Sequence, residues 1–194
     1  VIFGAHATCH SSHDHYVSGD YPGVLCELME RTFDSPCLFL AGSVGSMKPI
    51  DFGKPRSRWS RWMGCLLAHE TLAAIQRIEN YRSDVPLGSV GLELKLPAAQ
   101  LKLSRDGRVS PIAAGVLCPT EGYLQGVRID NRVLISTPCD FSGEIALHLR
   151  NAVPGITTVV TSFNGDYAGY VLPDEYYDRD TYEARSMSIL GRSA

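Results

Sequence analysis

Short apolar runs of strand length alternate along this chain with longer segments of helical periodicity, and this alternation constrains the fold more than any other feature. The strand-like runs are VIFGA at 1–5, CLFLAG at 37–42, RVLISTP at 132–138 and ITTVVTSF at 156–163. Helices are predicted over three segments, at about 20–33, 60–81 and 142–151. The interleaving of strands and helices predicts an α/β fold with packed helices.

The sheet is predicted to include antiparallel neighbours. GSVGLELKLP at 88–97 alternates apolar and polar residues, which is typical of a half-exposed strand. YLQGVRI and RVLISTP flank an Asp130-Asn131 turn as the two arms of a hairpin do. Because other strands are separated by helices, we expect parallel pairs as well, and therefore a mixed sheet.

Composition excludes two classes of partner. The chain is 44% hydrophobic and 20% charged with a net charge of -3, and it has no basic stripe that would attract nucleic acid. No run approaches the roughly 18 apolar residues of a membrane-spanning helix.

The chain opens on VIFGA, an apolar strand with no initiator Met and no signal-peptide pattern. We therefore expect that an upstream segment precedes it in the natural protein.

Three of the apolar runs end in residues that can bind a metal or line a site. VIFGA ends at His6, RVLISTP ends at Cys139-Asp140, and ITTVVTSF ends at the polar segment 164–170. Ligands in α/β folds gather where strand ends and their loops converge. The sequence therefore predicts a functional site at converging strand ends.

The six cysteines form no CxxC pair, so they do not indicate a structural zinc or redox site of that type.

Six motifs, in one order along nearly the whole chain, carry a family resemblance: IFGAH, VSGDYPG, FLAGSVGSMKP, STPCDFSGE, FNGDYAGYVLPDEYY and TYEARSMSILG. In this order and spacing they resemble the second half of the catalytic domain of neutral/alkaline ceramidases and their bacterial relatives. The resemblance implies that residues 1–194 form the C-terminal portion of such a domain, with the missing upstream half as its partner. Members of this family are commonly exported, which implies a periplasmic or secreted location.

The resemblance also implies a zinc-dependent amide hydrolase and assigns its site. The histidine of the family's F-x-x-H strand corresponds to His6, the carboxylate of its P-G-E-F-T motif to Asp140, and the second tyrosine of its Y-x-x-Y motif to Tyr170. These three are the expected zinc ligands, and one more histidine belongs to the upstream part. Tyr182, in the family's Y-E-A motif, is the implied hydrogen-bond donor to the oxyanion. Nitrogen and oxygen ligands with an open position suit a catalytic zinc.

The chain departs from the family pattern in two places. The family's G-D-V-S-P loop is replaced by GSMKP at 45–49, so that Lys48 stands for the serine and Ser46 for the aspartate. An ammonium group beside a dication prefers an anionic partner, so we expect Lys48 to bind an anionic part of the substrate. The second departure lies in the P-G-E-F-T motif, where Asp140 stands for the family's glutamate and Cys139 for its glycine.

The expected function is hydrolysis of an amide bond by metal-activated water, in a small-molecule or lipid substrate such as an N-acyl lipid. Two alternatives stay open. The changed loop at 45–49 also fits a degenerate family member that binds a lipid or glycan without catalysis. Cys139 fits a thiol nucleophile paired with a loop histidine. Four residues are expected to have only local roles: His10, His13 and His15 as polar loop residues, and Tyr167 as part of a turn.

Overall fold

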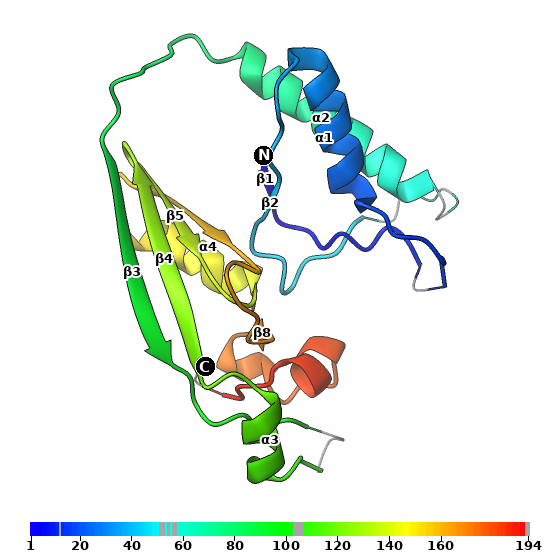
Figure 1. The fold of residues 1–194 in the computed structure, drawn as a ribbon, viewed down its shortest axis with the longest axis vertical. Coiled ribbons are helices and arrows are strands. Elements are labelled where there is room, and N and C mark those ends of the chain that lie inside the picture. The colour runs from blue at the N-terminus through cyan, green and yellow to red at the C-terminus, as the bar shows by residue number, and fades with distance from the viewer. Residues whose placement is uncertain (12, 51–52, 54, 56–57, 103–106, 193–194) are drawn as a thin grey trace. The chain divides into compact units, whose positions relative to one another are not determined.

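The computed structural model describes residues 1–192 except 12, 51–52, 54, 56–57 and 103–106 (Figure 1). The chain divides into two compact units. The first unit comprises Val1–Leu40 and Lys48–Asp84. The second unit comprises Ala41–Met47 and Val85–Ala194. The short segment Ala41–Met47 therefore belongs with residues that begin 38 positions after its end, at Val85. Each unit is described by itself.

The first unit is built around two helices. Its elements are β1 (Ile2–Phe3), α1 (Asp20–Phe33), β2 (Leu40–Ala41, whose second residue belongs to the other unit) and α2 (Trp59–Gln76). Figure 1 shows α1 and α2 side by side. A Cβ atom at Gly64 would lie 2.5 Å from Cβ of Val24, so the close approach of the two helices requires glycine there. Tyr21 and Leu25, both fully buried, fill the core beside α2.

The predicted helices of this unit are confirmed, with one difference in length. α1 has the predicted bounds, whereas α2 ends at Gln76 and not near residue 81. The backbone N–H groups of Arg77 and Ile78 bond to carbonyls three residues earlier, which tightens the last turn and ends the helix. Apolar periodicity continues for a few residues past a helix end, so it does not locate that end.

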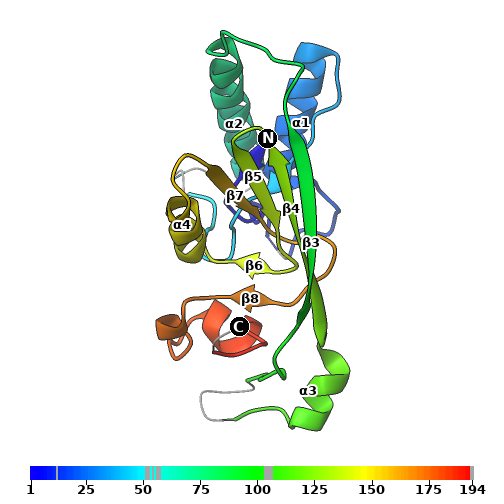
Figure 2. The ribbon, with the colours of Figure 1, turned by 90° about the vertical axis from the view of Figure 1, so that its left-hand side faces the viewer.

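The second unit contains the main sheet. Its elements are β3 (Leu87–Lys95), α3 (Pro111–Leu117), β4 (Glu121–Ile129), β5 (Arg132–Ser136), β6 (Asp140–Phe141), α4 (Gly143–Ala152), β7 (Thr157–Thr161), β8 (Tyr170–Val171), and the short helices η2 (Asp174–Tyr176) and η3 (Glu183–Met187). The main sheet has the order β3-β4-β5-β7, and a separate two-stranded sheet pairs β6 with β8. α4 packs against β7 (Figure 2).

The mixed sheet is confirmed. β3, β4 and β5 are antiparallel neighbours, and the β4–β5 hairpin turns at Asp130, whose φ of 56° is the left-handed conformation that such tight turns use. β5 and β7 are parallel, and α4 forms the crossover between them. The β-branched run of β7 suits an extended strand, and β7 is the last strand of the sheet beside β5. The α/β fold class is therefore the observed one.

β3 differs from its prediction. The sequence indicated a half-exposed strand, but every residue of β3 except Leu94 is exposed. β3 is an edge strand of its sheet, and among the described residues no element other than β4 makes extensive contact with it. Alternation in the sequence marks a face that can be buried, whereas burial itself needs another layer of structure to cover that face.

Among the described residues, every helix is too short or too polar to cross a membrane.

Candidate functional site

The frame of the site is the pair of parallel strands β5 and β7. Ser136, the last residue of β5, lies opposite Thr161, the last residue of β7. One residue further on, the backbone N–H and the side-chain hydroxyl of Thr137 both donate to the carbonyl oxygen of Thr161, each at 2.9 Å. Because parallel strands end on the same edge of a sheet, the segments that follow them start side by side.

The segment 162–169 then lies along residues 137–140 in the same direction. Backbone hydrogen bonds join Asn164 N to Thr137 O (3.0 Å), Ala168 N to Pro138 O (2.6 Å) and Asp140 N to Gly169 O (2.8 Å). Gly169 has a φ of 76°, and a Cβ atom there would lie 2.5 Å from the carbonyl oxygen of Met187. Only glycine combines that conformation with that contact. This loop leads directly into the small β6–β8 sheet.

The β6–β8 pairing brings three of the predicted site residues together. The register sets Asp140 opposite Tyr170, and the two are only 2% and 7% exposed. The ring of Tyr182 meets the Tyr170 ring edge to face, with centroids 6.3 Å apart. Tyr182 is 59% exposed, so it lies at the surface side of this cluster. The site residues Asp140, Tyr170 and Tyr182 are thus neighbours within the second unit.

A fourth residue of the cluster, Tyr167, was not predicted. Its hydroxyl donates a hydrogen bond of 2.7 Å to Oδ2 of Asp140. The sequence suggested only a residue of the turn, and Tyr167 does lie in the loop that precedes β8. The Y-x-x-Y spacing with Tyr170 is visible in the sequence, whereas the hydrogen bond from Tyr167 to Asp140 joins residues 27 positions apart.

Electrostatics in the cluster follow from burial and from one carboxylate. Burial, the hydrogen bond to Asp140 and the charge of Asp140 raise the pKa of Tyr167 above that of a free phenol. Burial, the Asp140 charge and neighbouring acidic groups likewise raise the pKa of Tyr170. The phenols are therefore protonated in the metal-free protein at neutral pH. A bound divalent cation would reverse this preference for Tyr170.

The loop at 45–47 packs directly on the strand that carries Asp140. Gly45 N donates to the carbonyl oxygen of Phe141 at 2.9 Å. The hydroxyl of Ser46 accepts from the backbone N–H of Gly143 at 3.0 Å and donates to Glu144 at 2.8 Å. Ser46 thereby satisfies one of the N–H groups at the start of α4, which have no partner within the helix. Ser46 therefore anchors the loop beside β6.

The two other predicted residues belong to the first unit. His6 follows β1 and is half-buried. Lys48 is exposed and is the first residue after the loop segment of the second unit.

Among the other N-terminal histidines, His10 takes part in a local network. Its backbone N–H donates to Asp20 Oδ2 at 3.1 Å, and its Nδ1 lies 2.8 Å from the hydroxyl of Tyr16. His13 and His15 are exposed. These contacts agree with the expectation that the later histidines are polar loop residues.

Cys139 does not have the surroundings of a thiol nucleophile. It is 4% exposed and packs with Ala168 and Leu190. Burial, with the neighbouring Asp140 charge, raises the pKa of its thiol to about 11, although a hydrogen bond with Thr137 opposes that shift. A reactive cysteine needs a lowered pKa and access to solvent, so the structure argues against the thiol hypothesis.

The donors of the cluster suit a divalent metal such as zinc. Asp140 offers a buried carboxylate and Tyr170 a phenol oxygen on the adjacent strand. Zinc accepts oxygen ligands of this kind in catalytic sites, together with histidine nitrogen. Within the described ranges, no three His, Cys, Asp or Glu side chains are grouped as a metal site.

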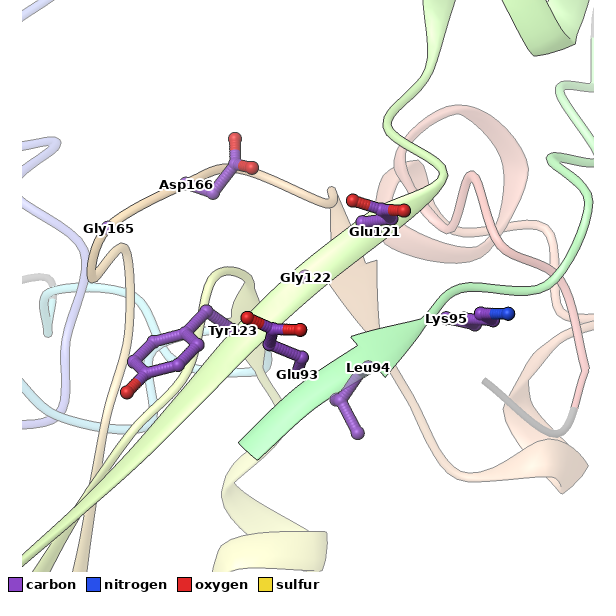
Figure 3. A pocket seen from close by; sticks show the side chains of 8 residues that line it. All are labelled: Glu93, Leu94, Lys95, Glu121, Gly122, Tyr123, Gly165 and Asp166. Carbon is purple, nitrogen blue, oxygen red and sulfur yellow. The ribbon is translucent and has the colours of Figure 1, made fainter. Parts of the chain in front are cut away.

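A pocket lies beside the same loop. It has a volume of about 560 Å³, and Figure 3 shows its side chains along β3 and β4, with Asp166 above them. It is lined by Glu93, Leu94, Lys95, Glu121, Gly122, Tyr123, Gly165 and Asp166. Asp166 also accepts the backbone N–H of Tyr167 at 2.7 Å. One wall of the pocket therefore belongs to the loop that carries Tyr167.

The fold and the cluster together define an α/β protein with a carboxylate and tyrosines gathered at the ends of parallel strands. No protein-family model matches the chain, and no curated protein matches it. Among solved structures, it is similar to neutral ceramidase from Pseudomonas aeruginosa, with a TM-score of 0.79, 18% identity and coverage of 98% of this chain and 40% of that chain. It is also similar to a ceramidase complexed with C2, with a TM-score of 0.77, 17% identity and coverage of 98% and 42%.

The chain therefore has the fold of part of a neutral ceramidase, which confirms the predicted resemblance at the level of the fold. It spans about 40% of the length of the neutral ceramidase that it matches.

Proposed function

We propose that residues 1–194 are the C-terminal portion of a neutral ceramidase-like catalytic domain that hydrolyses an amide bond with the help of zinc. The observation that carries this proposal is the β6–β8 register, which sets the buried Asp140 opposite Tyr170 with Tyr182 beside them. These are the positions to which the sequence motifs assigned metal ligands and an oxyanion donor. The fold similarity to neutral ceramidase supports the ceramidase-like fold on which the proposal rests.

Each residue has a distinct role in this proposal. Asp140 and Tyr170 would hold the zinc, and the sequence motifs assign His6 and a histidine of the upstream part as its further ligands. Bound zinc supplies a Lewis acid that polarises the scissile carbonyl and makes hydroxide available near neutral pH. The exposed phenol of Tyr182 donates a hydrogen bond to the carbonyl oxygen as negative charge develops there. The substrate is a small acylated molecule or an N-acyl lipid.

The metal content of the complete natural protein tests the proposal. We expect about one zinc per chain, and hydrolysis of N-acyl substrates that a chelator abolishes and added zinc restores. Asp140→Asn removes a charged ligand and should weaken zinc binding by more than about 100-fold, because even losing a neighbour of a ligand costs about 10–100-fold. The matched control is Asp84→Asn, since the Asp84 side chain is 90% exposed. Full activity in the metal-free protein contradicts the proposal.

In this proposal Lys48 makes the protein prefer acidic substrates. Its charge, at the exposed end of the loop that packs on β6, would attract an acidic group on the acyl compound. Lys48→Ala should raise KM for acidic substrates and leave zinc content unchanged, whereas Lys48→Arg, which keeps the charge, should retain a low KM. Lys48→Ser should improve turnover of neutral amides. Equal KM values for acidic and neutral substrates in all four proteins would refute this role.

The second candidate function is binding of a lipid or glycan without hydrolysis. The observation that favours it is the changed loop, in which Ser46 is engaged with Gly143 and Glu144 and Lys48 replaces the family's serine. The same assays separate the two functions. A protein that binds one zinc per chain and retains an N-acyl lipid, but releases no product from any amide, would be the degenerate family member.

A further inference from the structure

We propose that Tyr167 is a positioning residue that holds the Asp140 carboxylate in the orientation needed to bind the metal. This inference rests on the proposed function, because it assigns a role to a neighbour of one proposed ligand. The hydroxyl of Tyr167 donates to Oδ2 of Asp140 at 2.7 Å, which is the length of a hydrogen bond to a charged acceptor. The bond crosses from the loop before β8 to the first residue of β6.

A hydrogen bond from Tyr167 can fix the orientation of the Asp140 carboxylate. The residue is 2% exposed, so water does not compete for its oxygens as it does at the surface. A carboxylate rotates about its Cβ–Cγ bond, and that rotation decides which oxygen faces a ligand site. A fixed hydrogen bond to Oδ2 stops the rotation and sets the direction of the second oxygen. Partners of metal-binding carboxylates act in this way in many metal sites.

Tyr167 is itself held in place. Its neighbour Ala168 is bonded through the backbone to Pro138, two residues before Asp140. Its ring is 44% exposed and lies 6.5 Å from the ring of Phe163, at an angle of 34°. Phe163 has a φ of 60°, a conformation that costs a non-glycine residue about 1–3 kcal/mol and persists where surrounding contacts impose it. The loop therefore presents the Tyr167 hydroxyl inward from an otherwise exposed ring.

The replacement of the family's glutamate by aspartate increases the need for this contact. Asp140 is one methylene shorter than the family residue, so fewer side-chain conformations reach a metal that the rest of the site holds. A donor that selects one orientation compensates for part of that loss. A residue that only shapes the turn would need its ring and backbone, but not its hydroxyl.

The test is zinc affinity of the complete natural protein, measured in the metal-free form by competition with a fluorescent chelator. Tyr167→Phe removes the hydroxyl and keeps the ring, and we expect its Kd for zinc to rise about 10–100-fold. Tyr81→Phe removes a hydroxyl from a residue that is 78% exposed and should leave the Kd unchanged. Phe163→Leu removes the ring contact but keeps the Tyr167 hydroxyl and the Ala168 N to Pro138 O bond that holds its neighbour, so it should raise the Kd less than Tyr167→Phe does. Cobalt in place of zinc should show an altered visible spectrum in Tyr167→Phe alone, because its ligand geometry changes.

The outcomes separate this inference from the proposed function. Suppose that the parent protein binds zinc and that Asp140→Asn abolishes this binding. If Tyr167→Phe then binds zinc as tightly as the parent protein, the positioning role is wrong and the proposed function stands. If Phe163→Leu weakens zinc binding as much as Tyr167→Phe, packing of the loop is responsible and the role of the hydroxyl is refuted. If the parent protein binds no zinc, the proposed function and the positioning role are both overturned.

Discussion

Gly45→Ala tests how closely the loop at 45–47 is packed on the strand that carries Asp140. A Cβ atom at Gly45 would lie 2.4 Å from the carbonyl oxygen of Asp140 and 2.9 Å from the carbonyl carbon of Phe141, whereas ordinary contacts begin at 3.4 Å. Both neighbours are backbone atoms of β6, so neither can turn aside as a side chain could. The loop and the strand must separate by about 1 Å to admit the methyl group.

The cost of that separation follows from two terms. Inserting a methyl group into a tightly packed site costs about 1–3 kcal/mol, and losing the Gly45 N to Phe141 O hydrogen bond costs about 1 kcal/mol. We therefore expect Gly45→Ala to destabilise the protein by about 3 kcal/mol and to lower Tm by about 6–12 °C for a chain of this size. Displacement of β6 should also weaken zinc binding in the complete protein, because Asp140 moves with the strand.

Thermal unfolding followed by circular dichroism measures the effect. The matched control is Gly115→Ala in α3, where an added Cβ atom meets nothing within 4 Å. Alanine is favoured over glycine inside a helix, so this variant should be more stable by about 0.5–1 kcal/mol. If Gly45→Ala unfolds within about 2 °C of the parent protein, the close contact with β6 is absent in solution and the reasoning is wrong.

Two further predictions concern groups next to the site. Hydrogen bonds from Ser142 and Ser46 lower the pKa of Glu144 and outweigh the opposing effect of burial. A carboxyl with a lowered folded-state pKa stabilises the protein above its unfolded pKa, and this contribution is lost as pH falls through the folded value. Ser46→Ala removes the bond to Glu144 and the acceptor of the Gly143 N–H, so it should cost about 1 kcal/mol in urea unfolding at pH 7 and less at a pH low enough to protonate Glu144; an equal cost at both pH values would contradict it. Iodoacetamide at pH 8 should modify the exposed Cys65 and spare the buried Cys139 in the folded protein, as mass spectrometry can show; equal labelling would contradict the raised pKa of Cys139.

Local patterns in the sequence were sufficient for the larger elements. α1, the β4–β5 hairpin and the strand β7 lie where periodicity, turn residues and β-branched runs indicated. These features depend on interactions between residues close in sequence, so the sequence alone carries them. The order of the six motifs along the chain predicted a neutral ceramidase-like fold, and the structural similarity confirms that fold.

The small elements at the site could not be predicted in the same way. β6 and β8 are two residues long and pair across thirty positions of sequence, so neither has a periodicity to recognise. The exposed state of β3 was predicted wrongly for a related reason, since burial depends on which other layer covers a strand. The roles given to the five site residues stay predictions that rest on motifs: His6, Lys48, Asp140, Tyr170 and Tyr182.

The sequence by itself determined which residue types were available for a metal site and which strand ends would carry them. Only the tertiary structure decided that Asp140 is buried opposite Tyr170 and that Tyr167, expected only in a turn, donates to it. The physical reason is that a hydrogen bond between residues 27 positions apart depends on the path of the intervening chain. That path is set here by the parallel pairing of β5 with β7, which leaves no pattern at the two bonded residues.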